Sequence, residues 1–239
     1  MGNKLPIIEV RDLFSGYGEI LVLRGVTFEI IQGQIICIIG ANGAGKSTLL
    51  KTIFGLVKPR SGQITFLGED IIGLHPVDLL RLGISYVMQG RSNLPAMSVR
   101  DNLEMGAYIR NDGKVQDDLE ELLDRFLVLR RKEHEFAGNL SGGEQQILEM
   151  AMALMLHPKI ILLDEPSLGL APLMVEQVFE AINELNQDGT TVVLVEQNAK
   201  RALSISHQGV VLELGKVRQQ GSGQDLLHDE QLRRHYLGG

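Results

Sequence analysis

Three short stretches of this chain carry residue types that could bind and cleave a nucleotide. Residues 40–48 read Gly-Ala-Asn-Gly-Ala-Gly-Lys-Ser-Thr, residues 164–165 read Asp-Glu, and residues 140–146 read Leu-Ser-Gly-Gly-Glu-Gln-Gln. Closely spaced glycines let backbone amides turn inward around phosphate oxygens, and a lysine and a hydroxyl then add charge and a metal ligand. The paired carboxylates could hold Mg²⁺ and activate water.

The glycine-rich run lies in the context that a phosphate loop needs, with a strand before it and a helix after it. The apolar run 34–39 predicts a buried parallel strand, and a helix is expected to start near Lys46. We expect Lys46 to reach the β- and γ-phosphates as a catalytic group and Ser47 to ligate Mg²⁺. The residues predicted to bind ATP are Gly40, Ala41, Asn42, Gly43, Ala44, Gly45, Lys46, Ser47 and Thr48.

The two carboxylates close a second apolar strand, Ile160-Ile161-Leu162-Leu163. Asp164 is expected to hold Mg²⁺ through water. Glu165 lies one residue beyond the strand end, which makes it the better candidate for polarising an attacking water. An isolated strand that ends in acids is common, so this prediction depends on the phosphate loop upstream.

The elements that must position these residues follow from the apolar pattern. Short strands are predicted at 7–10, 26–30, 63–67, 159–163 and 191–195, with a hairpin at 210–219. Residues 98–156 are predicted to be mostly helical, beginning with a capping pair, Ser98 and Asp101. A further helix is expected at 174–187, and short polar helices at 224–236. One helical stripe is interpreted as core packing: Leu119, Leu122, Leu123, Phe126 and Leu127.

This alternation of strands and helices predicts an α/β fold with a P-loop NTPase (RecA-like) core. The first third adds an antiparallel β subdomain, and the helical block is an inserted α-helical subdomain. We expect one domain over 1–239, with the core and β subdomain at about 1–89 and 156–239. The helical subdomain is expected at about 90–155.

Composition narrows the functional classes. The net charge is −7 with 44% hydrophobic residues, and an acidic chain without basic clusters is a poor candidate for binding nucleic acid. No apolar run approaches the roughly 18 residues that span a bilayer. Met1 to Pro6 lacks the apolar stretch of a secretory signal, so a cytosolic protein is expected. Cys37, the only cysteine, is predicted to be a buried, inert thiol.

The Leu-Ser-Gly-Gly run lies some ninety residues after the phosphate loop and just before the second acidic motif. In this arrangement the sequence closely resembles ATP-binding cassette (ABC) ATPases along its whole length. The resemblance implies that the run closes over the ATP of a partner, so that the protein works as a pair. The signature residues that it implies are Leu140, Ser141, Gly142, Gly143 and Glu144.

Two further residues take a role only through this resemblance. Tyr17, ahead of the second strand, corresponds to the aromatic residue that stacks on adenine, a contact that suits a π face. Gln89 resembles the glutamine that senses the γ-phosphate and Mg²⁺ and joins the core to the helical subdomain. The resemblance also implies a docking groove for membrane subunits near residues 89–102.

Three departures from the general pattern resemble one subgroup, the LivF-type ATPases of branched-chain amino-acid importers. Gln197 stands where most ABC ATPases carry a catalytic histidine, Ala171 stands at a usual Asp, and Glu144 at a usual Gln. Glutamine can donate a hydrogen bond to a γ-phosphate but cannot carry the positive charge. The terminal run Tyr236 to Gly239 also resembles this subgroup. Slow hydrolysis at this chain's own site, with a faster partner site, is a second hypothesis.

The resemblance implies several partners: a LivG-like second ATPase or a second copy of this chain, two transmembrane permease subunits and, indirectly, an extracytoplasmic binding protein. It implies a peripheral position at the cytoplasmic face of the inner membrane. Importers of other neutral amino acids or urea, and a lipopolysaccharide-type exporter, stay open as alternatives. A soluble ABC ATPase acting on ribosomes or DNA is less favoured, because the chain has one cassette and no long coiled coil.

Overall fold

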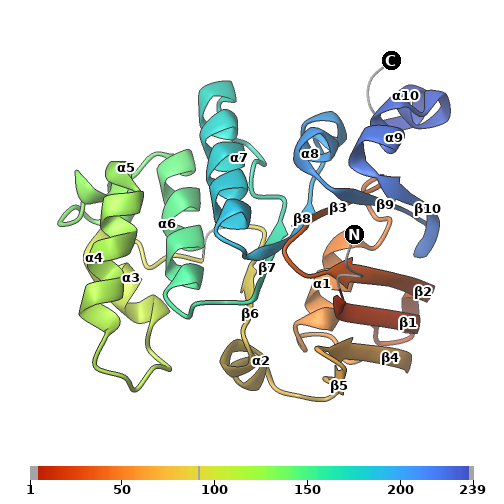
Figure 1. Ribbon diagram of the computed structural model, residues 1–239, viewed down its shortest axis with the longest axis horizontal. Coiled ribbons are helices and arrows are strands. Elements are labelled where there is room, and N and C mark those ends of the chain that lie inside the picture. The colour runs from red at the N-terminus through yellow and green to blue at the C-terminus, as the bar shows by residue number, and fades with distance from the viewer. Residues whose placement is uncertain (1–4, 91, 237–239) are drawn as a thin grey trace.

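The computed structural model describes residues 5–90 and 92–236. Residues 1–4 and 237–239, which entered the arguments on a secretory signal and on the terminal run, lie outside this range. The described chain forms two sheets with helices around them, as Figure 1 shows. No helix in it is both long and apolar enough to span a bilayer.

The larger sheet has six strands in the order β10-β9-β3-β8-β7-β6. Its strands pair in parallel except for the antiparallel hairpin of β9 and β10. This arrangement confirms the predicted α/β class and places the strands before the phosphate loop and before the carboxylates in one sheet. The strands are β3 (Ile35–Ile39), β6 (Ile84–Val87), β7 (Ile160–Asp164), β8 (Thr191–Val195), β9 (Gln208–Glu213) and β10 (Lys216–Ser222).

The smaller sheet is antiparallel, in the order β2-β1-β4-β5. Its strands are β1 (Pro6–Tyr17), β2 (Ile20–Ile31), β4 (Ser61–Phe66) and β5 (Glu69–Asp70). β1 is 12 residues long, whereas the sequence pattern predicted only residues 7–10. The difference arises at Asp12, which has a φ of 44° and lies at a register shift between Val10 and Leu13. Such an irregularity resets the inside–outside alternation, so the pattern breaks although the pairing continues.

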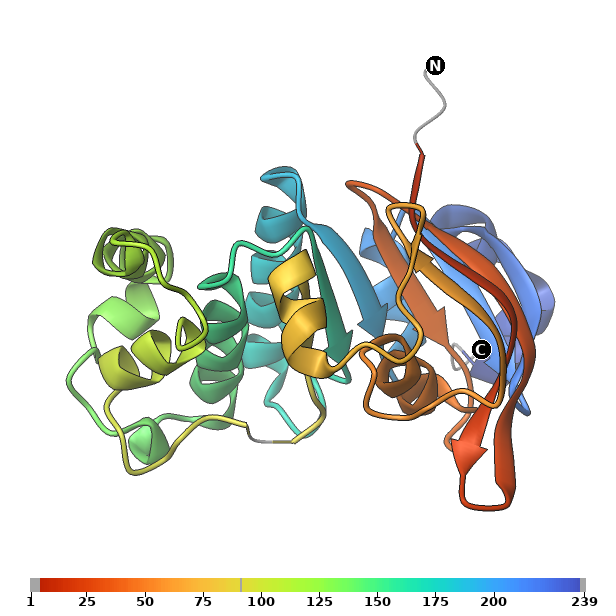
Figure 2. The same cartoon turned by 90° about the horizontal axis from the view of Figure 1, so that it is seen from below.

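The helices lie on both faces of the larger sheet and beyond its β6 edge (Figures 1 and 2). Helices α3 to α6 gather at the end of the molecule opposite the antiparallel sheet. The helices are α1 (Lys46–Ile53), α2 (Pro76–Leu82), α3 (Val99–Gly106), α4 (Val115–Arg125), α5 (Leu127–Arg130), α6 (Gly142–Leu154), α7 (Pro172–Gln187), α8 (Ala199–Ile205), α9 (Gly223–His228) and α10 (Glu230–Tyr236), with a 3₁₀ turn at Ala137–Asn139.

Strand β3 divides the core between the two faces of the sheet. Ile35, Cys37 and Ile39 pack in the apolar cluster that includes α6, α7 and α8. Ile36 and Ile38 pack in a second cluster with α1 and the antiparallel sheet. Because both faces are covered, the strand is a continuous apolar run, as predicted for a buried parallel strand. Burial raises the pKa of the Cys37 thiol, which is consistent with an inert residue.

The prediction of core packing is wrong for one residue of the helical stripe. Leu119, Leu122, Leu123 and Phe126 are buried, but Leu127 is 58% exposed. Helix α4 ends just before Phe126, whose φ of −102° and ψ of 78° are not helical, and α5 starts one residue later. Because the helix is interrupted here, Leu127 does not lie on the face where a continuous helix with 3.6 residues per turn would place it.

Where the sequence predicted a helix boundary, the structure agrees with it to within two residues; α2 and α8 were not predicted. The capping pair is confirmed: the Ser98 side chain accepts from the Asp101 amide, and the Asp101 carboxylate accepts from the Ser98 amide. Helix α7 begins at Pro172 rather than Met174, because proline suits the first helical position. Helix α6 ends at Leu154 rather than 156.

Candidate active site

The phosphate loop connects β3 to α1, and its glycines are required by the local geometry. A Cβ on Gly40 would lie 2.1 Å from the carbonyl oxygen of Leu212 on β9, so only glycine fits there. Gly45 has a φ of 106°, which glycine adopts without the steric cost of a side chain. The chain can therefore turn sharply and present its amides and the start of α1 toward a phosphate group.

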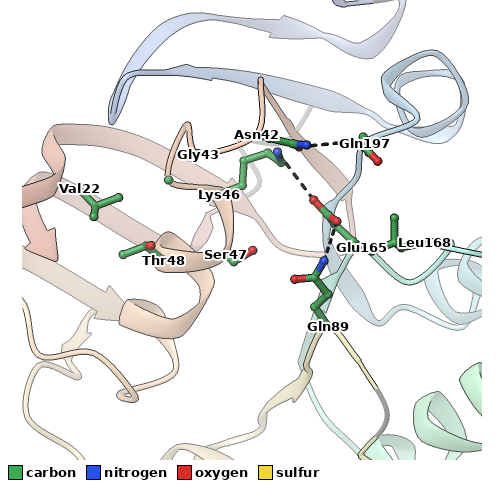
Figure 3. A pocket seen from close by; sticks show the side chains of 11 residues that line it. Val22, Asn42, Gly43, Lys46, Ser47, Thr48, Gln89, Glu165, Leu168 and Gln197 are labelled. Carbon is green, nitrogen blue, oxygen red and sulfur yellow. Dashed lines mark hydrogen bonds and ion pairs between the residues drawn. The ribbon is translucent and has the colours of Figure 1, made fainter. Parts of the chain in front are cut away.

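Lys46 projects into this loop and lies beside the predicted catalytic carboxylate. Its Nζ donates to the carbonyl oxygens of Gly40 at 2.9 Å and Ala41 at 3.3 Å. The same atom is 3.8 Å from Glu165 Oε1, and the side chain is only 5% exposed (Figure 3). A buried ammonium group in this position can neutralise charge on the phosphates that the loop would hold.

Ser47 and Asp164, two of the residues predicted to hold Mg²⁺, are in direct contact. Ser47 Oγ donates to Asp164 Oδ1 at 2.9 Å, and the Tyr86 hydroxyl donates to Asp164 Oδ2 at 2.9 Å. Burial and the neighbouring Asp164 raise the pKa of Tyr86, so its hydroxyl stays protonated as a donor. A hydroxyl and a carboxylate oxygen held this close are the hard oxygen ligands that suit Mg²⁺.

Glu165 has an unusual backbone conformation for a residue with a side chain. It follows β7 immediately, has a φ of 52°, and donates its amide to the Val195 carbonyl at 2.9 Å. Gln89 Nε2 donates to Glu165 Oε2 at 2.9 Å (Figure 3). Left-handed backbone at a non-glycine residue costs about 1 kcal/mol or more and is frequent at functional sites. The carboxylate is thus directed into the space beside the phosphate loop.

These side chains line a cavity of about 480 Å³. Gln197 reaches it from the loop after β8 and donates from Nε2 to Asn42 Oδ1 at 3.3 Å (Figure 3). The structure therefore brings together predicted residues from four separate segments. The lining residues are Val22, Asn42, Gly43, Gly45, Lys46, Ser47, Thr48, Gln89, Glu165, Leu168 and Gln197.

Some site residues were not predicted from the sequence, and five residues predicted to bind ATP or Mg²⁺ do not line the cavity: Tyr17, Gly40, Ala41, Ala44 and Asp164. Val22 and Leu168 line it, but nothing in their sequence context signalled this. Tyr86 could have been noticed as the one hydroxyl-bearing ring in an apolar strand. Tyr17, at the end of β1, is 47% exposed and is absent from the lining. Its role against adenine stays a prediction.

The signature residues lie apart from this cavity, at the start of α6. Ser141 and Glu144 form a reciprocal cap: the Ser141 amide donates to Glu144 Oε2 at 2.8 Å, and the Glu144 amide donates to Ser141 Oγ. Lys132 also pairs with Glu144, at 3.0 Å. The remaining signature residues are Leu140, Gly142 and Gly143, and none of the five lines the cavity. A function on a partner's nucleotide is compatible with this separation and stays a prediction.

Comparison with known proteins agrees with this geometry. The family model described as ABC transporter matches residues 23–168, more than half of the chain. The chain belongs to the ABC transporter family. As a member in which Asp164 ends β7 and Glu165 follows it, this ABC ATPase binds nucleotide and hydrolyses ATP. The crystal structure of the ADP conformation of an ATP-binding cassette superposes with a TM-score of 0.88 at 29% identity, covering 98% of this chain and 100% of that one.

Two curated relatives cover nearly the whole chain. One is the high-affinity branched-chain amino acid transport ATP-binding protein BraG of Pseudomonas aeruginosa, 43% identical over 93% of this chain and 96% of the relative. The other is the probable branched-chain amino acid transport ATP-binding protein LivF of Archaeoglobus fulgidus, 39% identical over 97% and 99%. The resemblance to this subgroup, which rested on Gln197, Ala171 and Glu144, is confirmed.

Proposed function

We propose that this ABC ATPase is the ATP-hydrolysing subunit of an importer for branched-chain or other neutral amino acids. The observation that carries the proposal is the 43% identity to BraG over 93% of the chain. Two lipopolysaccharide export ATP-binding proteins are also similar to this chain, but only at 32% and 31% identity. The hypothesis of an exporter is therefore less favoured. The cavity supports the chemistry, and the relatives support the cargo.

Within the cavity, each group has a distinct task in ATP hydrolysis. The loop amides and Lys46 bind the phosphates, and Glu165 accepts a proton from the attacking water. Gln197 donates a hydrogen bond toward the γ-phosphate. Mg²⁺, held by Ser47, Asp164 and Gln89, would spread the charge that develops on the phosphate oxygens.

Transport requires that the hydrolysis be coupled to other subunits. Residues 140–144 would close over the ATP of a second ATPase subunit, either LivG-like or a second copy of this chain. The helical subdomain, at about 90–155, would move together with the segment that carries Gln89. This movement would be transmitted to two permease subunits docked near residues 89–102. These contacts would hold the chain at the cytoplasmic face of the inner membrane, and a binding protein would deliver the amino acid from the other side.

The test is uptake of labelled leucine by source cells whose only copy of this protein carries Glu165→Gln. Other amino acids and urea serve as parallel cargoes, and cells with the exposed substitution Glu180→Gln serve as the matched control. Selective loss of leucine or neutral amino-acid uptake would support the proposal. Unchanged uptake of every cargo, with the purified wild-type chain still hydrolysing ATP, would overturn the cargo assignment and leave the ATPase chemistry intact.

A further inference from the structure

Glu196 is a buried carboxylate between the loop that carries Glu165 and the loop that carries Gln197. It follows β8 directly and is only 2% exposed. Among the side chains that the structure describes, in residues 5–90 and 92–233, no lysine, arginine or histidine forms an ion pair with it. A buried carboxylate without a cation is costly unless backbone or polar groups satisfy both oxygens, so its hydrogen bonds define its role.

Those hydrogen bonds come from amides on both loops. Glu196 Oε1 accepts from the Ser167 amide at 3.0 Å, and Oε2 accepts from the Gln197 amide at 3.1 Å. Burial raises the pKa of Glu196, whereas hydrogen bonds from the Ser167 side chain and from the Ser167, Asn198 and Gln197 amides favour its charged form. One side chain therefore fixes the backbone of two loops that belong to neighbouring strands.

Each loop carries a residue that lines the ATP cavity. Ser167 is two residues after Glu165, and Gln197 comes directly after Glu196. The two strand ends are already joined by the bond from the Glu165 amide to the Val195 carbonyl. The Glu196 carboxylate adds a second connection, to the Ser167 amide two residues after Glu165, where the loops leave the sheet and no longer pair as strands.

We propose that Glu196 is a positioning residue for hydrolysis, which holds Glu165 and Gln197 at a fixed separation around the γ-phosphate. It contacts neither the cavity nor the substrate, because it is absent from the lining and buried. Catalysis by a placed base depends strongly on geometry, since a displacement of about 1 Å can cost roughly 100-fold in rate. The inference rests on ATP hydrolysis in this cavity, but not on the cargo.

The experiment compares wild type, Glu196→Gln and Glu196→Asp in the transporter purified through a tag on this chain. Glutamine keeps the size of the side chain but offers one acceptor oxygen instead of two, so one loop loses its anchor. We expect kcat to fall roughly ten- to 100-fold while KM and ATP affinity stay within about twofold. Asp keeps both oxygens on a shorter stem and should recover part of kcat. The exposed Glu180→Gln serves as the matched control.

A purely structural role predicts a different result, because loosened loops would weaken nucleotide binding together with turnover. Folding of each variant is checked by its thermal midpoint, and Glu196→Asp decides the question if Glu196→Gln does not fold. The proposal is overturned if kcat of the folded variant stays within about twofold of wild type, or if KM rises as much as kcat falls. A wild-type complex without ATPase activity would instead refute the function of the cavity itself.

Discussion

The Tyr86 hydroxyl donates a 2.9 Å hydrogen bond to Asp164 Oδ2 across the neighbouring parallel strands β6 and β7. The other oxygen of the same carboxylate accepts from Ser47 at 2.9 Å. The two bonds hold one carboxylate oxygen each, so they orient the proposed metal ligand Asp164. Burial and Asp164 raise the pKa of Tyr86, which keeps the phenol a donor at neutral pH.

Removal of this hydroxyl should weaken the metal site without disturbing the nucleotide loop. We expect Tyr86→Phe to raise the Mg²⁺ concentration needed for half-maximal ATPase activity by about 10-fold or more, as outer-shell partners of metal ligands do. The measurement is a Mg²⁺ titration at saturating ATP. Tyr108→Phe, at a tyrosine that is 79% exposed, is the matched control. An unchanged Mg²⁺ midpoint in Tyr86→Phe would show that Asp164 is oriented without this bond.

Glu165→Gln should separate ATP binding from hydrolysis. The amide can keep the contact with Gln89 but cannot accept a proton from water, so we expect kcat to fall on the order of 10²–10⁴-fold. ATP affinity should stay within about twofold, since the phosphate loop is unchanged. The checks are steady-state ATPase assays and equilibrium nucleotide binding. Undiminished turnover would remove Glu165 from this role. It would also favour the hypothesis that a partner's site carries most of the hydrolysis.

The sequence predicted what depends on local pattern. The strand before residues 40–48, the strands at 159–163 and 191–195 and the capping pair at Ser98 all follow from residue periods and turn chemistry. Helices α2 and α8, in contrast, were not predicted. Leu127 was misplaced because the break after Arg125 carries no glycine or proline to signal it. The length of β1 was missed because a bulge interrupts its alternation.

Site residues could be predicted where they belong to a sequence motif, but not where only the tertiary packing brings them to the site. Val22 lines the cavity from β2, and Tyr86 contacts Asp164 from β6. Both strands are distant in sequence from the residues that they meet. No local pattern marks Val22, and the only signal for Tyr86 is a hydroxyl-bearing ring in an apolar strand. Glu196, in contrast, did carry a signal: it is a carboxylate that directly follows an apolar strand, as Asp164 closes β7.

Gly143 has a packing role in addition to the predicted role in the signature. A Cβ on this residue would lie 2.3 Å from the terminal methyl carbon of Met174 and 2.7 Å from its Cβ, in helix α7. We expect Gly143→Ala to destabilise the protein by about 1–3 kcal/mol, because a tightly packed contact must shift. Urea unfolding measures the loss. Gly113→Ala, where the added methyl group meets open space, should change stability far less. Equal effects in the two variants would exclude the packing explanation.

Asp118 on α4 joins Arg110 to His157, on the turn that leads into β7, and so ties the helical block to the sheet. It accepts from Arg110 and lies 2.9 Å from His157 Nε2. The hydrogen bond from His157 and the bond from Arg110 lower the pKa of Asp118 below its ordinary value of about 3.9. The folded state therefore binds the proton more weakly than the unfolded chain does. The resulting stability is present above about pH 4 and is lost as pH falls through the folded-state pKa.

Asp118→Asn should therefore destabilise the protein at pH 7 by about 1 kcal/mol, and this deficit should shrink as pH falls below about 4. Urea unfolding of wild type and variant between pH 7 and pH 3 measures the difference. Asp117→Asn, at the exposed neighbour in the same helical turn, controls for the charge near the start of α4. If the contacts to Arg110 and His157 stabilise the fold, the difference in the free energy of unfolding between wild type and variant depends on pH for Asp118→Asn alone. If this difference stays constant with pH, or if Asp117→Asn shows the same difference, the stabilisation comes from negative charge near the start of α4 and not from the contacts to Arg110 and His157.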